Sequence, residues 1–177
     1  LVRELSVNNL NLNKCELCSL PYADAAFDAV FCYGVIFLTP WRESLRELKR
    51  VLKPGGTLYV NANGLGWYMF LWKTEYNKAS DYDPKQVAAS AMMSTLRYER
   101  EGCHDIGTNL IIEPDLLKHE LLNLGFTNID VALEGRLNHN VNGLLAKPFF
   151  KGEYFGETGV YEVIATMPKS DRSDKEL

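Results

Sequence analysis

Four cysteines are the residues whose spacing most directly raises a chemical question: Cys15, Cys18, Cys32 and Cys103. Cys15 and Cys18 form a C-x-x-C pair, and His104 is a conceivable further ligand, so a zinc or redox site is one interpretation. Zinc sites usually have a second paired knuckle, and redox pairs usually open a helix, whereas this pair follows the strand-like segment NLNLNK. We therefore favour four buried reduced thiols and expect no metal.

Length and composition limit the classes of protein that are possible. The chain has 177 residues, 46% of them hydrophobic and 24% charged, with a formal net charge of -4. This favours one globular domain and gives no basic surface for nucleic acid or an anionic membrane. No stretch approaches the roughly 20 apolar residues of a membrane span, and the N-terminus lacks the apolar core of a signal peptide. We expect a cytoplasmic protein with a small-molecule or protein partner.

The elements that would position any site start with a β-α-β unit. The run Phe27 to Tyr33 is almost continuously apolar, as in a strand buried in a parallel sheet. A Thr39-Pro40 start and apolar residues at helical spacing predict a helix over about 40–52. Pro54, Gly55 and Gly56 stop it before the next strand. The pattern predicts that 28–33 and 57–62 are adjacent parallel strands.

The remainder of the chain interrupts this rhythm and then resumes it. Residues 63–112 contain a Gly- and aromatic-rich segment and a helix around Pro84 to Arg97, which predicts a helical lid insertion. A helix over 114–124, a strand from Phe126 to Val131 and a last strand over 159–166 follow. We expect one domain over 1–168 and a disordered tail over 169–177.

The segments CELCSLPYADAAFDAVFCYGVIFL and WRESLRELKRVLKPGGTLYV, in this order, resemble the core of class I S-adenosylmethionine-dependent methyltransferases. An acidic residue lies before Leu20-Pro21, Phe27-Asp28 opens a strand, and Leu52 to Gly56 forms a Leu-Lys-Pro-Gly-Gly turn. With Gly125-Phe126 and the final strand, the likeness extends to about 110 of the 177 residues.

The resemblance implies an α/β fold with a partial Rossmann-like sheet, strands three to seven of the family, and S-adenosylmethionine as cofactor. Glu16 would accept a hydrogen bond from the adenine amino group. The backbone just after the strand 28–33 would lie against the cofactor. The alternative for Glu16 is a solvated acid, and for the other residues core packing or loop geometry. The cofactor-binding residues implied in this way are Glu16, Leu17, Tyr33, Gly34, Val35 and Phe37.

The chain departs from the family pattern in one large respect. The first strand with its Gly-rich loop and the strand ending in a ribose-binding acid are not found, and Gly64-x-Gly66 stands too late to replace the loop. We expect the C-terminal portion of a methyltransferase domain, with roughly the first 60–90 residues of a typical domain absent. It would bind the cofactor weakly or not at all. The absence of the neighbouring strands would expose the edge of 28–33. We expect residues 9–15, or a second copy in a homodimer, to cover that edge.

The function implied is methyl transfer to a small-molecule acceptor, and the strand end does not resemble the motif for methylating nucleic-acid bases. Positioning dominates such a displacement, so the catalytic residue is unknown and none is required. Candidates for a general base are His104, Glu101 and His139. Candidates for the acceptor pocket are Trp67, Tyr68, Trp72 and His104. The alternatives are a non-catalytic dimerisation or partner-binding module and, less well supported, a nicotinamide-dependent Rossmann enzyme.

Overall fold

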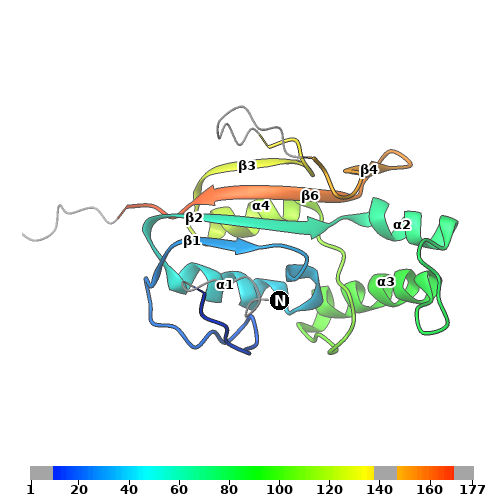
Figure 1. Cartoon of the computed structure of the whole chain (residues 1–177), viewed down its shortest axis with the longest axis horizontal. Coiled ribbons are helices and arrows are strands. Elements are labelled where there is room, and N and C mark those ends of the chain that lie inside the picture. Colours follow the sequence, from blue (N-terminus) through cyan, green and yellow to red (C-terminus); the bar gives the residue numbers. More distant parts are fainter. Residues whose placement is uncertain (1–9, 138–146, 170–177) are drawn as a thin grey trace, which may run out of the picture.

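The computed structural model describes residues 10–137 and 147–169 (Figure 1). Within them a β-α-β unit is followed by three helices and then by four strands. The elements are β1 (Phe27–Cys32), a 3-10 helix η1 (Ile36–Leu38), α1 (Trp41–Val51), β2 (Leu52–Asn63), α2 (Leu65–Thr74), α3 (Pro84–Glu101), α4 (Pro114–Asn123), β3 (Thr127–Leu133), β4 (Glu153–Tyr154), β5 (Glu157–Thr158) and β6 (Val160–Thr166).

The main sheet has four strands in the order β1-β2-β6-β3. β1 and β2 are parallel, with Ala29 opposite Thr57 and Cys32 opposite Val60, and α1 connects them. This confirms the predicted crossover unit. β6 runs antiparallel to both β2 and β3. The α/β, partial Rossmann-like fold is therefore confirmed.

Helix α1 follows from its sequence pattern. Trp41, Leu45 and Leu48 are buried against the sheet, while the charged residues between them face outward. One detail differs from the expected start: Pro40 is the N-cap, and the Thr39 hydroxyl instead donates to the carbonyl of Ile36 at 2.7 Å.

Strand β2 begins earlier than the sequence pattern predicts. The expected turn over 54–56 lies inside the strand, which starts at Leu52 directly after the helix. Gly55 donates its N–H to the carbonyl of Met167, and Met167 donates to Gly56, at 2.9 and 2.8 Å. Because these bonds extend the ladder toward the C-terminal strand, the segment is sheet instead of turn.

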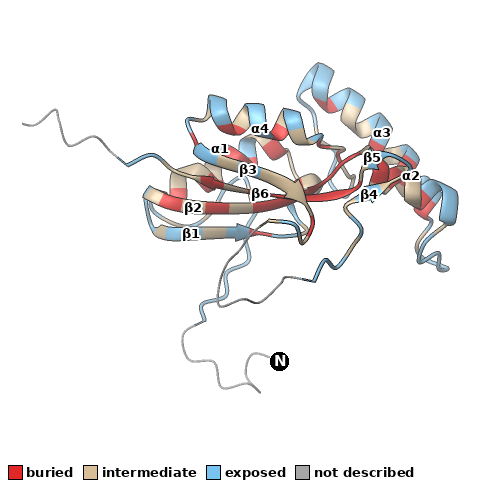
Figure 2. Cartoon of the chain, turned by 90° about the horizontal axis from the view of Figure 1, so that it is seen from above, coloured by how far each residue is buried: buried red, intermediate tan, exposed pale blue. Residues whose placement is uncertain are grey.

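The two faces of the sheet are covered differently. Helices α1 and α4 lie on one face, and no helix in the described residues lies on the other (Figure 2). Side chains on the covered face form the main core, among them Leu58, Val60 and Val163. On the opposite face Phe31 is 71% exposed. This part of the chain thus has two layers, the sheet and the helices on one of its faces.

The segment over 63–112 forms two helices that pack together, α2 and α3; the helix around Pro84 to Arg97 was predicted, whereas α2 was not. Asp83 caps α3 by accepting hydrogen bonds from the amides of Lys85 and Gln86, and Pro84 occupies the first turn. The start of α2 lies against the β4–β5 hairpin: a Cβ placed on Gly66 would lie 2.3 Å from the carbonyl oxygen of Glu157. Only glycine allows this close approach of two backbones.

The described part of the segment before β1, residues 10–26, adds no strand to the main sheet. Residues 10–15 have no regular structure, so the described part of this segment does not cover the β1 edge. Within the described residues, β1 pairs with β2 alone. The expected tail over 169–177 lies, apart from residue 169, outside the described residues. No helix in the described residues is long and apolar enough to cross a membrane.

Candidate functional site

An apolar cavity of about 400 Å³ runs along β1 and brings together three of the predicted cofactor residues. Leu17, Tyr33 and Val35 line it. The rest of its wall comes from the turn before β1, from β1 itself and from α1, namely Leu20, Tyr22, Phe27, Ala29, Val30, Phe31, Cys32, Leu48 and Val51. Residues from three successive segments of the chain therefore meet at one concave, mostly hydrophobic surface, as is usual for small-molecule sites.

The other three predicted cofactor residues do not line this cavity. Glu16 is exposed in a tight turn whose carbonyl accepts from the amide of Ser19 at 3.0 Å. Gly34 has φ +73 and donates its N–H to Oδ1 of the buried Asn61 at 2.6 Å. Phe37 packs against the main core.

The predicted acceptor residues do not converge on one pocket. Trp67 contacts Phe150 at a ring separation of 4.9 Å and also lines a cavity of about 420 Å³ in the insertion. Tyr68 is fully buried, and its hydroxyl donates to the carbonyl of Leu110 at 3.3 Å. Trp72 lies 49% exposed on a third surface. Successive residues of a helix point about 100° apart, so neighbours in sequence separate in space.

The candidate bases are placed as follows. His104 Nε2 lies 3.0 Å from the carbonyl oxygen of Thr108, which lines the cavity of Trp67. Glu101 is exposed and forms an ion pair with Arg97 at 3.2 Å. His139 lies outside the described residues.

The cysteines differ from the expectation of four buried thiols. Cys15, Cys18 and Cys103 are exposed, because the C-x-x-C segment forms a surface turn; only Cys32 is buried, on β1. Burial raises the pKa of the Cys32 thiol to about 11. Within the described residues, no three His, Cys, Asp or Glu side chains are grouped to hold a metal ion.

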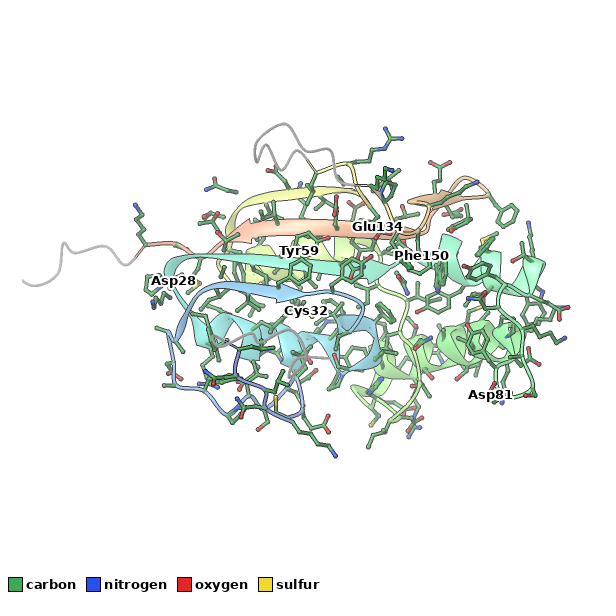
Figure 3. The ribbon with its side chains drawn as sticks, viewed as in Figure 1. Asp28, Cys32, Tyr59, Asp81, Glu134 and Phe150 are labelled. Atoms are coloured by element: carbon green, nitrogen blue, oxygen red, sulfur yellow. The ribbon has the colours of Figure 1, made fainter. Side chains whose placement is uncertain are left out.

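A buried polar network near the carboxyl end of β1 was not predicted. The Tyr33 hydroxyl donates to Glu134, and the Tyr59 hydroxyl donates to Glu162 at 2.8 Å. The two carboxylates are only 5% and 3% exposed, and each also accepts a backbone N–H, from Phe150 and Leu137 respectively. Figure 3 shows Tyr59 and Glu134 close together on this side of the sheet, with Asp81 far away in the insertion.

The sequence carried one signal for this network. Glu162 stands within the apolar strand Val160–Thr166, where a charged residue needs a partner. The partners themselves are about a hundred residues away in the chain, so that signal could not identify them.

The network keeps its tyrosines protonated. Burial raises the pKa of Tyr33 above its ordinary value, and its hydrogen bond to Glu134 raises it further. Tyr59 has a raised pKa for the same two reasons, with Glu162 as its partner. Both hydroxyls are therefore donors to the carboxylates at neutral pH.

The residues along β1 fit part of the predicted cofactor. An apolar cavity suits a planar ring, and the exposed Glu16 carboxylate next to Leu17 can accept from an exocyclic amine. In open α/β sheets ligands bind outside the carboxyl ends of the strands, which is where Tyr33 and Gly34 lie. The described residues thus suit the adenine end of S-adenosylmethionine.

Comparison with protein families supports the motif assignment. Residues 2–60 match the family model described as "Methyltransferase domain". The matched range includes the Leu-Pro, Phe-Asp and Lys-Pro-Gly-Gly motifs. The resemblance to a methyltransferase domain is therefore confirmed for residues 2–60.

Curated relatives match over a short segment. A demethylmenaquinone methyltransferase of Corynebacterium urealyticum is 51% identical over 43 residues, 24% of this chain and 19% of that protein. An arsenite methyltransferase of Aquipseudomonas alcaligenes is 49% identical over 47 residues, 26% of this chain and 14% of that protein. These matches span a fifth or less of the relatives' length.

A solved structure extends the fold comparison to most of the chain. A Thermotoga maritima protein, described as a methyltransferase dependent on S-adenosylmethionine and a possible histamine N-methyltransferase, has a TM-score of 0.53 at 16% identity. The alignment covers 94% of this chain and 68% of that one. At this identity the comparison establishes the fold alone.

Proposed function

We propose that this chain is part of an enzyme that transfers a methyl group from S-adenosylmethionine to a small-molecule acceptor. One observation carries the proposal: Leu17, Tyr33 and Val35, which the family motifs assign to the cofactor, line one cavity along β1. The family match over 2–60 and the fold support the same reaction class.

The chain's own residues would bind and orient the two reactants. Glu16 would accept from the adenine amino group, the apolar wall would hold the ring, and Gly34 would keep the backbone after β1 in its turn through the bond to Asn61. When bound, the cofactor supplies an electrophilic methyl group on a sulfonium. Excluding water and aligning the acceptor are then the main requirements.

For an acceptor that loses a proton, we propose the Tyr33–Glu134 pair as an additional candidate base beside His104, Glu101 and His139. Tyr33 is partly exposed at the strand end, and its hydroxyl is bonded to a buried carboxylate. An acceptor hydroxyl could donate to Tyr33 while Tyr33 donates to Glu134, so the proton would end on the carboxylate.

Binding of the demethylated product tests the cofactor side directly. We would titrate the ¹⁵N-labelled chain with S-adenosylhomocysteine and follow amide shifts by NMR. Because the described residues supply mainly the adenine side, we expect a dissociation constant near the millimolar range, with shifts at Glu16, Leu17, Tyr33 and Gly34.

Two results would count against this assignment. One is the absence of shifts at these amides up to about 10 mM ligand. The other is an equal response to reduced nicotinamide mononucleotide, which carries no adenine and would therefore favour the nicotinamide-dependent alternative. Glu16→Gln should weaken binding, whereas Glu153→Gln, in the exposed hairpin, should not.

A second candidate function is a non-catalytic dimerisation or partner-binding module. Among the described residues the outer edge of β1 has no partner strand and Phe31 is exposed; both favour this function, since an unpaired edge strand can pair with another chain. We propose a two-fold homodimer through this edge. Light scattering at tens of micromolar protein should give a molecular mass about twice the 20.1 kDa of one chain. The Phe31→Lys substitution should lower this mass. A monomeric mass would contradict the homodimer.

A further inference from the structure

The surface of α2 that points away from the sheet raises a question of its own. Helix α2 has the sequence LGWYMFLWKT, with apolar residues on every side. Such a helix is normally buried all round. Tyr68 and Leu71 are buried, in contact with Ala88 and Ala91 of α3, and Phe70 stacks on Tyr154 of the hairpin.

The third side of α2 stays open and faces a groove. This groove has a volume of about 430 Å³ and is lined by Met69, Trp72, Lys73, Ala89, Met92 and Met93. Trp72 is 49% exposed and Met93 is 68% exposed. Ala89 is the small residue among these, so its place on α3 leaves the hollow between the larger side chains.

The groove is apolar along its length, with one cation at its margin. Lys73 contributes its aliphatic stem, and its ammonium lies 3.9 Å from the centre of the Phe155 ring. In the described residues no carboxylate pairs with Lys73, whereas the nearby Lys78 and Lys85 both pair with Glu75. A ligand in the groove would therefore meet methionine and tryptophan along its chain. Beside it would lie an ammonium group that contacts the Phe155 ring and that no described carboxylate pairs with.

We propose that this groove binds a single-chain anionic amphiphile, such as a medium-chain fatty acid. Flexible methionine side chains adapt to a hydrocarbon chain, and the Lys73 ammonium complements a carboxylate head group. The two contributions are separate, so the chain length and the head group of the ligand can be varied independently. This site shares no lining residue with the cavity along β1 and does not depend on the proposed methyl transfer.

The test uses decanoate below its micelle concentration, with binding measured by calorimetry. We expect affinity to rise about twofold to fourfold for each added methylene between octanoate and dodecanoate. A terminally brominated decanoate should quench part of the tryptophan fluorescence, and Trp72→Phe should remove that quenching.

Variants separate the apolar and the charged parts of the site. Ala89→Phe fills the hollow and should reduce decanoate affinity at least tenfold. Lys73→Gln should weaken decanoate about fivefold and leave decanol unchanged. Leu122 on α4 is about as exposed as Trp72, so Leu122→Gln is the control and should change the affinity for neither decanoate nor decanol. Circular dichroism of each variant checks that it is folded.

Four results would overturn the proposal. They are no quenching by the brominated ligand, unchanged affinity in a folded Ala89→Phe variant, equal affinity for decyltrimethylammonium, and binding to phosphatidylglycerol vesicles without binding to free decanoate. The last result would identify a membrane surface as the partner in place of a single amphiphile. S-adenosylhomocysteine binding should be the same in all these variants, so failure here is distinguishable from failure of the proposed function.

Discussion

The two faces of the central sheet differ in what they carry and in what covers them. On the face beneath α1 and α4, Leu58, Val60 and Val163 are at most 2% exposed. On the other face, Phe31 stacks on Tyr59 at 4.6 Å, and the carboxylate of Glu162 accepts the Tyr59 hydroxyl. The same strands supply both faces, because successive side chains alternate. The covered face therefore holds the apolar core, and the other face holds the hydrogen bonds between tyrosines and buried carboxylates.

The sharpest test of this contrast is a pair of truncations on adjacent strands. Leu58→Ala creates a cavity in the covered core and should lower the free energy of unfolding by about 3 kcal/mol. Phe31→Ala removes a larger but mostly exposed side chain and should cost about 1 kcal/mol or less. Urea denaturation followed by circular dichroism measures both values. Equal losses would show that the open face is covered in solution.

The hydrogen bond from Tyr59 to Glu162 should make a smaller but clear contribution. Tyr59→Phe removes a donor to a buried carboxylate and should cost about 1.5–3 kcal/mol. Tyr76→Phe is the matched control, because the Tyr76 hydroxyl has no hydrogen bond within the described part of the chain. A Tyr59→Phe variant as stable as this control would mean that Glu162 does not need the hydroxyl.

The raised pKa of Tyr59 predicts how stability depends on alkaline pH. Its ordinary value is 10.0, and the folded state raises it, so the unfolded chain loses the proton first. The stabilisation is fully present below pH 10 and is lost as the pH rises above 10. The slope contributed is at most about 1.4 kcal/mol per pH unit.

Unfolding measured between pH 8 and 11.5 should show this slope reduced in Tyr59→Phe and unchanged in Tyr76→Phe. Other buried tyrosines, such as Tyr98 with a pKa of about 12, contribute equally to the pH slope of both variants. The difference between the variants therefore isolates Tyr59, and parallel curves would refute its role.

The covered face was predictable because its signals are local. Two signals are enough to predict the crossover unit. One is the helical spacing of Trp41, Leu45 and Leu48, and the other is the short connection from α1 to β2. The predicted start of β2 was wrong, since the Pro54-Gly55-Gly56 turn joins the sheet through Met167, which lies over a hundred residues later. The predicted burial of Cys15 and Cys18 was also wrong, because a short surface turn leaves no core to receive them.

The open face was not predictable from the same kind of signal. Tyr33 meets Glu134, and Tyr59 meets Glu162, only because β6 runs antiparallel to both β2 and β3 with a particular register. No local pattern specifies such pairings. The aromatic residues of α2 illustrate the converse: Trp67, Tyr68 and Trp72 are close in sequence, yet the helix directs them to three surroundings.

The close approach at Gly66 also determines how the helical insertion can move. The amide of Gly64 donates to the carbonyl of Gly159 at 2.7 Å, and Gly66 lies directly against the backbone of Glu157. The backbone at the start of α2 is therefore held against the hairpin, at the place where a hinge would need free backbone rotation. Any swing of α2 would have to carry the β4–β5 hairpin with it. The two segments should open to solvent together and at one rate, as a single mechanical unit.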